Sequence, residues 1–327
     1  MIQKVEREPN ESHGRGEVRR LTVKVPGSTA NIGPGFDSLG LAFQLYCTLD
    51  FDLLQENDRN IPLITLKGKG VDHGLPKDQS NLIYTVLSNL WQNDPHLLSR
   101  IRITIESDIP LGKGLGSSAA AIMGAVWAAH ALVEESIPDN SALLQKATEL
   151  EGHSDNVAAS LLGGLVICAR SNNTRKIVTQ KLTWPQEWKT LVVVPHYVLS
   201  TKRARAVLPK TIQREDAIHN VQRVALLAAA VVNKDEEAMH EALHDRLHEP
   251  YRLQLCPELS AVRRVVSDLP VIGTTLSGAG SSVMVTVHQR HKAAALEALQ
   301  TWAATQIQPC DVLDLQVEPK GLSVSYE

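Results

Sequence analysis

A glycine-rich segment at residues 109–121, IPLGKGLGSSAAA, has the composition of a phosphate-binding loop. Its three glycines, Gly112, Gly114 and Gly116, would let the backbone approach an anion closely. A strand is expected before it and an alanine-rich helix after it, and the first N–H groups and the dipole of a helix attract negative charge. The Walker motif needs a lysine after the last glycine, whereas Lys113 comes early. Taken alone, the segment predicts either an anion site or a glycine-rich connector with helix-capping serines.

A second polar segment, residues 25–43, interrupts an expected strand with the sequence VPGSTANIGPGFDSLGLAF. Its prolines and glycines predict a rigid loop that presents the amide of Asn31 and the carboxylate of Asp37. Such a loop could bind a small polar ligand. It could equally be a long turn in which the Asn and Asp side chains make local backbone hydrogen bonds.

Two more segments have a similar character. Residues 151–164, EGHSDNVAASLLGG, bring His153, Asp155 and Asn156 together just before an expected helix, where such side chains also serve as caps. Residues 275–285, TLSGAGSSVMV, form a glycine loop between two expected strands, and a plain hairpin explains that loop as well.

A competing motif lies at residues 240–244, HEALH, which matches the HExxH pattern of zinc proteases. On a helix its two histidines would share one face, and Glu241 could act as a base. The longer form of the motif is not present, because Leu247 stands where that form requires glycine. The mixed charges nearby favour an ordinary solvent-exposed helix, with a zinc hydrolase as the alternative.

Composition narrows the classes of protein. The 327 residues fit one large domain or two ordinary ones, and the net charge of -3 argues against nucleic-acid binding. Four well-separated cysteines, with no CxxC pair, indicate buried, reduced thiols in a cytoplasmic protein. The longest apolar run, residues 119–133, is shorter than the ~20 residues of a membrane span and includes His130, so it predicts a buried helix.

The elements that must position these segments follow a mixed α+β pattern. Residues 1–18 predict a flexible tail, and a change of composition at residues 184–188 suggests two domains, residues 19–186 and 187–327. Strands are expected at residues 21–25, 41–54, 101–107, 163–169, 190–195 and 312–317, with two more within residues 269–287. Helices are expected at residues 81–91, 119–133, 140–151, 214–248 and 291–303.

Six segments in a fixed order make the chain resemble the GHMP small-molecule kinases from about residue 21 to its end. They are VPGSTANIGPGFDSLGLAF, IPLGKGLGSSAAA, ELEGHSDNVAASLLGG, STKRARAVLP, HEPYR and TLSGAGSSVMV. The third and fourth are most similar to the branch that phosphorylates homoserine. The resemblance implies a ribosomal-S5-domain-2-like N-terminal α+β domain and a ferredoxin-like C-terminal α+β domain. It also implies ATP-dependent, Mg²⁺-dependent phosphorylation of the side-chain hydroxyl of L-homoserine, in threonine biosynthesis in the cytoplasm, by an enzyme that can form a homodimer.

The resemblance also implies roles for particular residues. ATP would be held by Asn81 at the adenine and by the loop residues Pro110, Leu111, Gly112, Lys113, Gly114, Leu115, Gly116, Ser117, Ser118, Ala119 and Ala120. The amino acid would be bound by Asn31, Asp37, His153, Asn156, Arg205 and Arg252. Asp37 would face its ammonium group, and the two arginines would clamp its carboxylate, which suits their forked guanidinium groups. The implied catalytic residues are Asn156, Asp37 and Asn31, with Asn156 near the reacting hydroxyl.

Two departures from the family pattern bear on mechanism. Several relatives carry Asp where this chain has Asn156, and an amide cannot accept a proton, so no general base is evident. Phosphoryl transfer can rely on positioning and charge neutralisation instead. The metal-binding Glu of relatives corresponds to Gln145, and Glu149 lies one turn later on the same helical face. The expected metal ligands are therefore Ser117, Ser118 and Glu149. Gln145 as a weak ligand is the alternative to Glu149, which could also be an exposed helix charge. A mevalonate-type GHMP kinase and a non-catalytic nucleotide-binding protein are the remaining alternatives.

Overall fold

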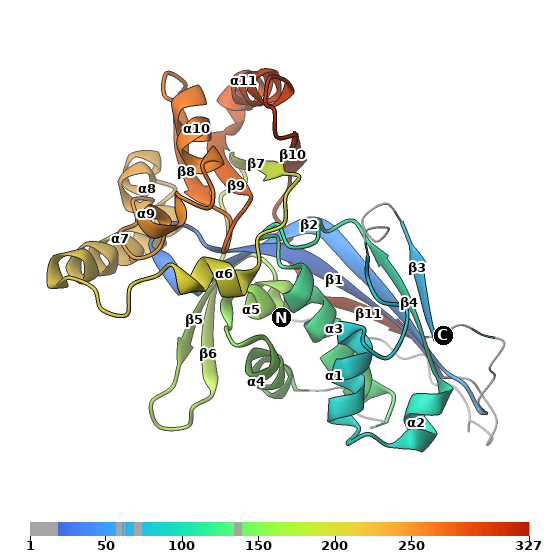
Figure 1. Ribbon diagram of the computed structural model, residues 1–327. Helices are drawn as coiled ribbons and strands as arrows, with labels where there is room; N and C mark the ends of the chain where they lie inside the picture. Colours follow the sequence, from blue (N-terminus) through green and yellow to red (C-terminus); the bar gives the residue numbers. More distant parts are fainter. Residues whose placement is uncertain (1–18, 57–60, 62, 69–73, 134–138, 327) are drawn as a thin grey trace.

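Two β-sheets, each flanked by helices, make up the protein (Figure 1). The computed structural model describes residues 19–56, 61, 63–68, 74–133 and 139–326. The tail expected at residues 1–18 lies outside the described residues. The first sheet has seven strands and the second has four.

A long hairpin of β1 (Arg19–Asn31) and β2 (Gly35–Leu53) is the centre of the first sheet. The other strands of this sheet are β3 (Ile64–Lys67), β4 (Ile101–Ser107), β5 (Leu165–Arg170), β6 (Ile177–Leu182) and β11 (Ser323–Tyr326). The register of the hairpin shifts between Pro26 and Ser28 and again at its tip. Such irregularities bend a strand pair, and the tip of the hairpin reaches the second half of the molecule.

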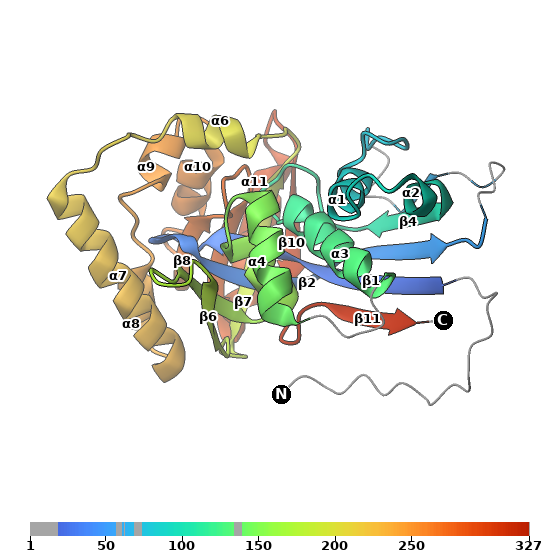
Figure 2. The same ribbon diagram turned by 90° about the horizontal axis from the view of Figure 1, so that it is seen from below.

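Helices cover one face of the first sheet (Figure 2). They are α1 (Leu82–Leu90), α2 (Pro95–Arg100), α3 (Ser117–Ala131), α4 (Asn140–Glu151) and α5 (Asp155–Leu162). The small side chains of α3 let it lie very close to the hairpin: a Cβ atom on Gly124 would stand 2.5 Å from Leu49 Cδ1. The buried helix predicted from the alanine-rich run is therefore confirmed.

The second sheet is antiparallel. Its strands, in spatial order, are β10 (Cys310–Leu315), β7 (Trp188–Pro195), β9 (Val283–His288) and β8 (Val271–Leu276). The helical elements of this half are α6 (Thr201–Ala206), α7 (Arg214–Asn233), α8 (Glu236–Ala242), α9 (Glu249–Arg252), α10 (Glu258–Val265), the 3-10 turn η1 (Gln289–His291) and α11 (Lys292–Ala304). A separate apolar core, which includes Leu191, Leu259 and Leu299, joins this sheet to α10 and α11.

The helical region expected at residues 214–248 is divided into two helices, and it ends before residue 248. Lys234 adopts a left-handed conformation, with φ of 56°, and ends α7. Asp235 then caps a new helix, because its side chain accepts a hydrogen bond from the backbone N–H of Ala238. α8 in turn stops at Ala242, and a short turn leads to α9.

The chain passes from the first sheet to the second between β6 and β7, across residues 184–188. The division into residues 19–186 and 187–327 remains a prediction. The last residues of the second range do not follow this division. Strand β11 pairs with β1, with Leu21 opposite Tyr326, and so lies in the first sheet.

The cysteines carry no disulfide bond. All four cysteines are free, with Cys47, Cys168 and Cys256 buried and Cys310 half-buried. Burial raises the pKa of Cys47 to about 12, so that thiol is protonated near neutral pH. Over the described part of the chain, every helix is too short or too polar to cross a bilayer.

Candidate active site

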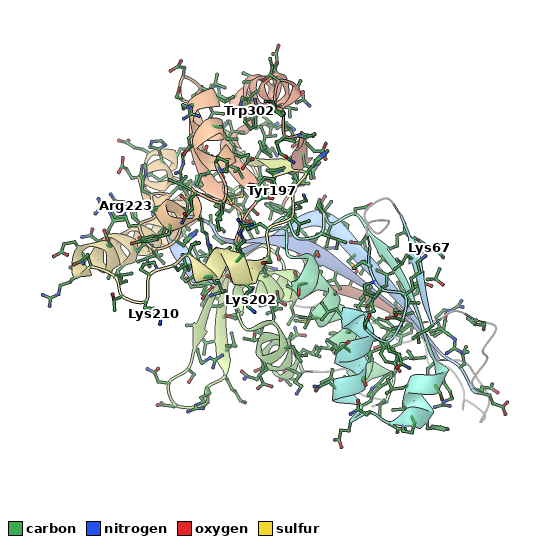
Figure 3. The ribbon with its side chains drawn as sticks, viewed as in Figure 1. Lys67, Tyr197, Lys202, Lys210, Arg223 and Trp302 are labelled. Atoms are coloured by element: carbon green, nitrogen blue, oxygen red, sulfur yellow. The ribbon has the colours of Figure 1, made fainter. Side chains whose placement is uncertain are left out.

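A cleft of about 110 Å³ is lined by residues from both halves of the molecule. It is bordered by the β1–β2 tip, the loop before α3, the turn between α4 and α5, helix α6, the end of α9, and the β8–β9 loop. In Figure 3, α6 lies between the two halves, and Tyr197 marks the approach to it from β7. The structure thus brings together the four polar segments that the sequence analysis singled out.

The loop before α3 has the backbone of an anion-binding site. Gly112, Gly114 and Gly116 all adopt positive φ angles, of 63°, 79° and 73°. Gly114 also has no room for a side chain, because a Cβ atom there would stand 2.2 Å from Ser277 O. Gly116 is the N-cap of α3 and supplies no side-chain cap. The first N–H groups of this 15-residue helix therefore remain available to a phosphate.

Lys113 ties this loop to the second half of the molecule. Its Nζ donates a hydrogen bond to Tyr197 O, and its carbonyl accepts one from Ser282 N at 3.1 Å. Burial lowers the pKa of Lys113. Contact of Lys113 with ATP remains a prediction, whereas its structural contacts brace the loop.

The β8–β9 loop supports the phosphate loop from behind. Ser277 Oγ donates to Gly114 O at 2.7 Å and lies 2.8 Å from Thr29 Oγ1. Gly278 N donates to Ala30 O at 3.1 Å. This loop is thus the hairpin turn expected from the sequence, and it also supports the phosphate loop.

A serine and a carboxylate meet beside the start of α3. Ser118 Oγ donates to Glu151 Oε2 at 2.8 Å. Burial raises the pKa of Glu151, and the hydrogen bond from Ser118 and the nearby His153 only partly offset that effect. Hydroxyl and carboxylate oxygens are the ligands that Mg²⁺ prefers, so these two groups fit a magnesium ion bound next to the phosphate loop.

The α4–α5 turn holds the next polar side chains. His153 Nδ1 donates to Asp155 Oδ1 at 2.7 Å. Burial lowers the pKa of His153, but the hydrogen bond and the charges of Asp155 and Glu151 outweigh it, so the net pKa is raised. Asn156 is buried and directs its Nδ2 at Ser28, with donor distances of 3.0 Å to both Ser28 O and Ser28 Oγ. Strand β1 thereby fixes the Asn156 amide.

Opposite charges face each other at the other side of the cleft. Arg205 makes two hydrogen bonds to Asp37, Nη2 to Oδ1 at 2.6 Å and Nη1 to Oδ2 at 3.0 Å. Asp37, whose φ is 56°, is held by its own N–H, which donates to Asn31 Oδ1 at 3.1 Å. Asn31 Nδ2 in turn donates to Gly278 O at 2.8 Å.

The second arginine of the cleft is almost completely enclosed. Arg252 is 1% exposed, and its Nε donates to Ala204 O at 3.1 Å. Burial and the like charge of Arg205 lower the pKa of Arg252 to about 10, so it is still cationic near neutral pH. Both guanidinium groups lie over the Phe36 ring, with centroid distances of 5.5 Å for Arg205 and 5.4 Å for Arg252.

Comparison with known proteins gives consistent matches. The family model of the GHMP kinase N-terminal domain matches residues 81–164, and that of the C-terminal domain matches residues 227–304. A homoserine kinase of Moorella thermoacetica is 37% identical over 262 residues, which cover 80% of this chain and 86% of the relative. A homoserine kinase of Solibacter usitatus is 40% identical over 266 residues, with 80% and 84% covered. The chain belongs to the GHMP kinase family.

Solved structures agree with this assignment. The crystal structure of a homoserine kinase from Cytophaga hutchinsonii superposes with a TM-score of 0.80 at 27% identity, covering 96% of this chain and 100% of that one. A mevalonate diphosphate decarboxylase from Staphylococcus aureus, 15% identical with a TM-score of 0.68, shares the fold. The predicted two-domain α+β fold of the GHMP kinases is therefore confirmed.

The structure of this GHMP kinase does not bring Glu149 into the cleft. Glu149 accepts a hydrogen bond from Gln145 Nε2 at 3.0 Å and lies 3.8 Å from Lys146 Nζ, beside a separate surface groove. Two residues along a helix point in nearly opposite directions, so Glu151 faces the cleft and Glu149 faces away. Glu151 was not among the residues predicted from the sequence, although its place directly before the GHSDN segment was a usable signal.

Asn81 also lies away from the cleft of this GHMP kinase. It is the N-cap of α1, and its Oδ1 accepts from Ile83 N at 2.9 Å. Its Nδ2 donates to Pro76 O at 2.7 Å, so both ends of the amide are engaged. Asn81 thus caps α1 in this structure, and its contact with adenine stays a prediction.

The HEALH segment does not form one helical face. α8 ends at Ala242, so His244 lies beyond the helix that carries His240. His240 Nδ1 contacts Ile272 O at 3.0 Å, and Glu241 lies 3.7 Å from Arg223. Within the described residues, no group of three or more His, Cys, Asp or Glu side chains is arranged to hold a metal ion.

Proposed function

We propose that this protein is a homoserine kinase, which transfers the γ-phosphoryl group of ATP to the side-chain hydroxyl of L-homoserine. The observation that carries the proposal is a group of opposite charges in the cleft: the Asp37 carboxylate lies beside the Arg205 and Arg252 guanidinium groups, next to a glycine-rich phosphate loop. An amino acid carries one ammonium and one carboxylate group, which match these side chains. The homoserine kinases among the relatives support the same substrate.

Binding of ATP is assigned to the loop of residues 110–116 and the start of α3. The free N–H groups there would hold the triphosphate, and the β8–β9 loop would keep the phosphate loop rigid. Ser118 and Glu151 would hold Mg²⁺, with Ser117 as a further candidate. The ion, when bound, neutralises charge on the phosphates.

Orientation of the amino acid is assigned to the opposite wall. Asp37 and Arg205 would release each other: Asp37 would bind the ammonium group, and Arg205 would bind the carboxylate together with Arg252. Asn31 positions Asp37 through a hydrogen bond to its backbone. His153 would border the same pocket.

Catalysis would then rest on positioning. Asn156, fixed on Ser28, would orient the hydroxyl toward the γ-phosphoryl group, and this amide has no capacity to take up a proton. The hydroxyl proton would leave to the phosphoryl oxygens as the new P–O bond forms and the bond from the γ-phosphorus to the bridging oxygen breaks, which releases ADP. The product would be O-phospho-L-homoserine, and the reaction would be a step in threonine biosynthesis. We also propose that the enzyme acts in the cytoplasm and that it forms a homodimer.

A coupled assay of ADP release tests the proposed activity. Homoserine, mevalonate, galactose and shikimate would be compared as phosphoryl acceptors, and a signal well above the others is expected for homoserine. A stronger signal with mevalonate would instead identify a mevalonate-type kinase. ATP binding without turnover on any of the four would indicate a non-catalytic nucleotide-binding protein.

A matched pair of variants on one helix sharpens this assay. Arg205→Ala removes a group of the cleft, whereas Lys202→Ala removes an exposed charge of the same short helix, α6. We expect a higher KM for homoserine with Arg205→Ala and wild-type kinetics with Lys202→Ala. Equal kinetics for the two variants would contradict the assigned carboxylate site.

A further inference from the structure

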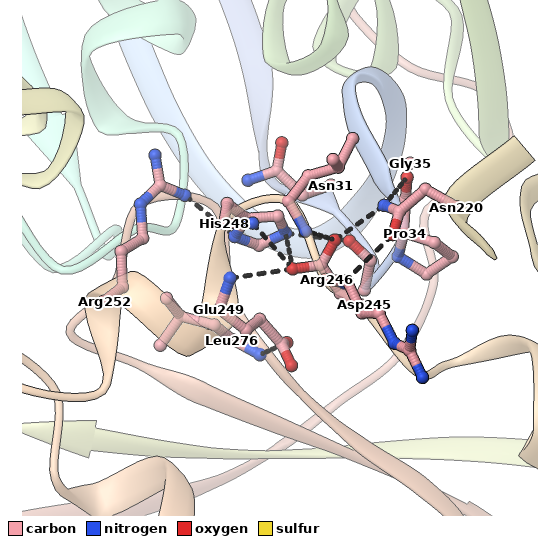
Figure 4. Close-up of polar contacts among 12 residues, drawn as sticks. Asn31, Pro34, Gly35, Asn220, Asp245, Arg246, His248, Glu249, Arg252 and Leu276 are labelled. Atoms are coloured by element: carbon pink, nitrogen blue, oxygen red, sulfur yellow. Dashed lines mark hydrogen bonds and ion pairs between the residues drawn. The ribbon is translucent and has the colours of Figure 1, made fainter. Parts of the chain in front are cut away.

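A set of buried hydrogen bonds behind the cleft connects the hairpin tip to α9 (Figure 4). At its centre is His248, the residue directly before α9, whose side chain is 0% exposed. One ring nitrogen contacts the tip of the β1–β2 hairpin and the other contacts Arg252. His248 does not line the cleft itself.

The two contacts fix the protonation state of the ring. His248 Nε2 lies 2.8 Å from Gly33 O, and a carbonyl can only accept, so Nε2 carries the hydrogen. His248 Nδ1 lies 3.1 Å from Arg252 Nη1, and a guanidinium can only donate, so Nδ1 must present its lone pair. Only the neutral imidazole with its hydrogen on Nε2 satisfies both neighbours.

The backbone around His248 is held just as firmly. Asp245 Oδ2 accepts from His248 N at 2.8 Å and from Glu249 N at 2.7 Å. Asn220 Nδ2 donates to Asp245 Oδ1 at 2.7 Å and to Pro34 O at 3.1 Å. The turn before α9 is thereby bound to the same hairpin tip that the imidazole contacts.

The other face of the ring reaches the cleft wall. The imidazole stacks on Phe36 with centroids 5.3 Å apart, and Phe36 lies one residue before Asp37. Arg252 makes its remaining hydrogen bonds to Ala204 O and to Gly278 O at 3.3 Å. His248 therefore links the segment that carries Asp37 to Arg252 by a hydrogen bond at each ring nitrogen, beside the direct contact between Phe36 and Arg252.

We propose that His248 is a positioning residue that sets the separation between the ammonium end and the carboxylate end of the amino-acid site. The inference rests on the proposed function, in which Asp37 and Arg252 bind those two ends. Loss of the Nδ1 acceptor leaves the Arg252 guanidinium free to turn toward other partners. Homoserine binding then weakens, while the phosphate loop on the opposite wall keeps its own contacts.

Two substitutions separate the contacts of the ring. Asn places its Oδ1 near the position of Nδ1 and keeps an acceptor for Arg252, whereas Gln places its Nε2 near the imidazole Nε2 and keeps a donor for Gly33. His248→Gln is expected to raise the KM for homoserine about tenfold or more, the usual effect of losing a hydrogen bond to a charged group. His248→Asn is expected to stay within about threefold of the wild type. The KM for ATP should change less than twofold in both.

A double-mutant cycle checks that the effect passes through Arg252. In an Arg252→Ala background, His248→Gln should change the KM for homoserine much less than it does in the wild type, because the group that it orients is gone. His219→Gln is the matched control: this histidine of α7 contacts His244 O, outside the network, and wild-type kinetics are expected.

The outcomes distinguish the two proposals. A wild-type protein without activity on homoserine overturns the proposed function. If the wild type is active, either of two results overturns the role of His248. One is that His248→Gln and His248→Asn raise the KM for homoserine equally. The other is that the variants change the KM for ATP in parallel with the KM for homoserine. Should the His248 variants not fold, Asn220→Ala decides: a rise of about threefold in the KM for homoserine is expected, and an unchanged KM in the folded variant contradicts the positioning role.

Discussion

Asp37 and Arg205 neutralise each other on one wall of the cleft, with two hydrogen bonds of 2.6 Å and 3.0 Å. In the proposed function the same two groups bind opposite ends of one amino acid. The substrate must therefore replace a bond within the protein by two bonds to itself. A ligand with both charges leaves neither side chain unpaired, whereas a ligand with only one charge does. The pair thus favours zwitterionic substrates.

Asp37→Asn should weaken this discrimination. We expect the KM for homoserine to rise about ten- to hundredfold, because the ammonium group loses a charged partner. The preference for homoserine over 4-hydroxybutanoate, which lacks the amino group, should fall, as measured by the ratio of kcat/KM values. Asp50→Asn is the control on the same strand, since Asp50 bonds to Thr22 away from the cleft. An undiminished preference in Asp37→Asn would contradict the assignment of the ammonium site.

Gly114→Ala should damage the phosphate loop. The new Cβ atom would stand 2.2 Å from Ser277 O and would also strain a residue with φ of 79°. We expect the KM for ATP to rise and the free energy of unfolding to fall by about 2 kcal/mol. Gly74→Ala shares the positive φ, at 90°, but meets no atom within 4 Å, so it should leave the KM for ATP unchanged. Steady-state kinetics measure the KM for ATP, and chemical denaturation measures the free energy of unfolding. Equal effects of Gly114→Ala and Gly74→Ala would contradict the claim that the close contact with Ser277 O requires glycine at position 114.

The sequence predicted the parts of the site that depend on local chemistry. The glycine loop was recognisable because the left-handed turns at Gly112, Gly114 and Gly116 and the helix start after them are encoded within a few residues. Asn31 and Asp37 were recognisable for the same reason. The fold followed from the order of six such segments.

The parts that were missed depend on tertiary contacts or on helix register. Glu149 and Glu151 lie on different faces of α4: Glu151 faces the cleft and Glu149 faces a separate groove. A sequence motif does not specify which face of a helix meets the cleft. The contact between His248 and Gly33 joins residues 215 apart in the chain. The pairing of β11 with β1 likewise joins residues near opposite ends of the sequence, and no local sequence pattern predicts it.

His153 gives the protein a defined dependence of stability on pH. Burial lowers its pKa, but Asp155 and Glu151 outweigh burial, so the folded state holds the imidazolium and the net pKa is raised. The stabilisation is therefore complete below the unfolded value of about 6.5 and is lost as pH rises through the folded pKa. The difference in Tm between the wild type and His153→Gln should be largest in acid and should shrink toward alkaline pH.

Thermal melts from about pH 5 to about pH 9 measure this difference on both sides of the histidine range. His196→Gln is the control, because His196 pairs with Asp311 at the surface, where ion pairs contribute little. Its Tm should follow the wild type throughout. A His153→Gln difference that grows with rising pH would contradict the assigned charge state.

Glu151→Gln and Glu149→Gln test which carboxylate serves the metal. Glu151 Oε2 accepts from Ser118 Oγ at the start of α3, whereas Glu149 contacts Gln145 and Lys146 on the outer side of α4. We expect Glu151→Gln to raise the Mg²⁺ concentration for half-maximal activity about tenfold or more, because an amide replaces a charged ligand. Glu149→Gln should titrate with Mg²⁺ like the wild type.

The Mg²⁺ requirement should also depend on pH. Burial raises the pKa of Glu151, so a proton competes with the metal for this carboxylate at acid pH. The wild type should therefore need more Mg²⁺ as pH falls, and Glu151→Gln should lose that dependence. The reverse pattern, with Glu149→Gln sensitive to Mg²⁺, would return the metal site to the position first expected from the sequence.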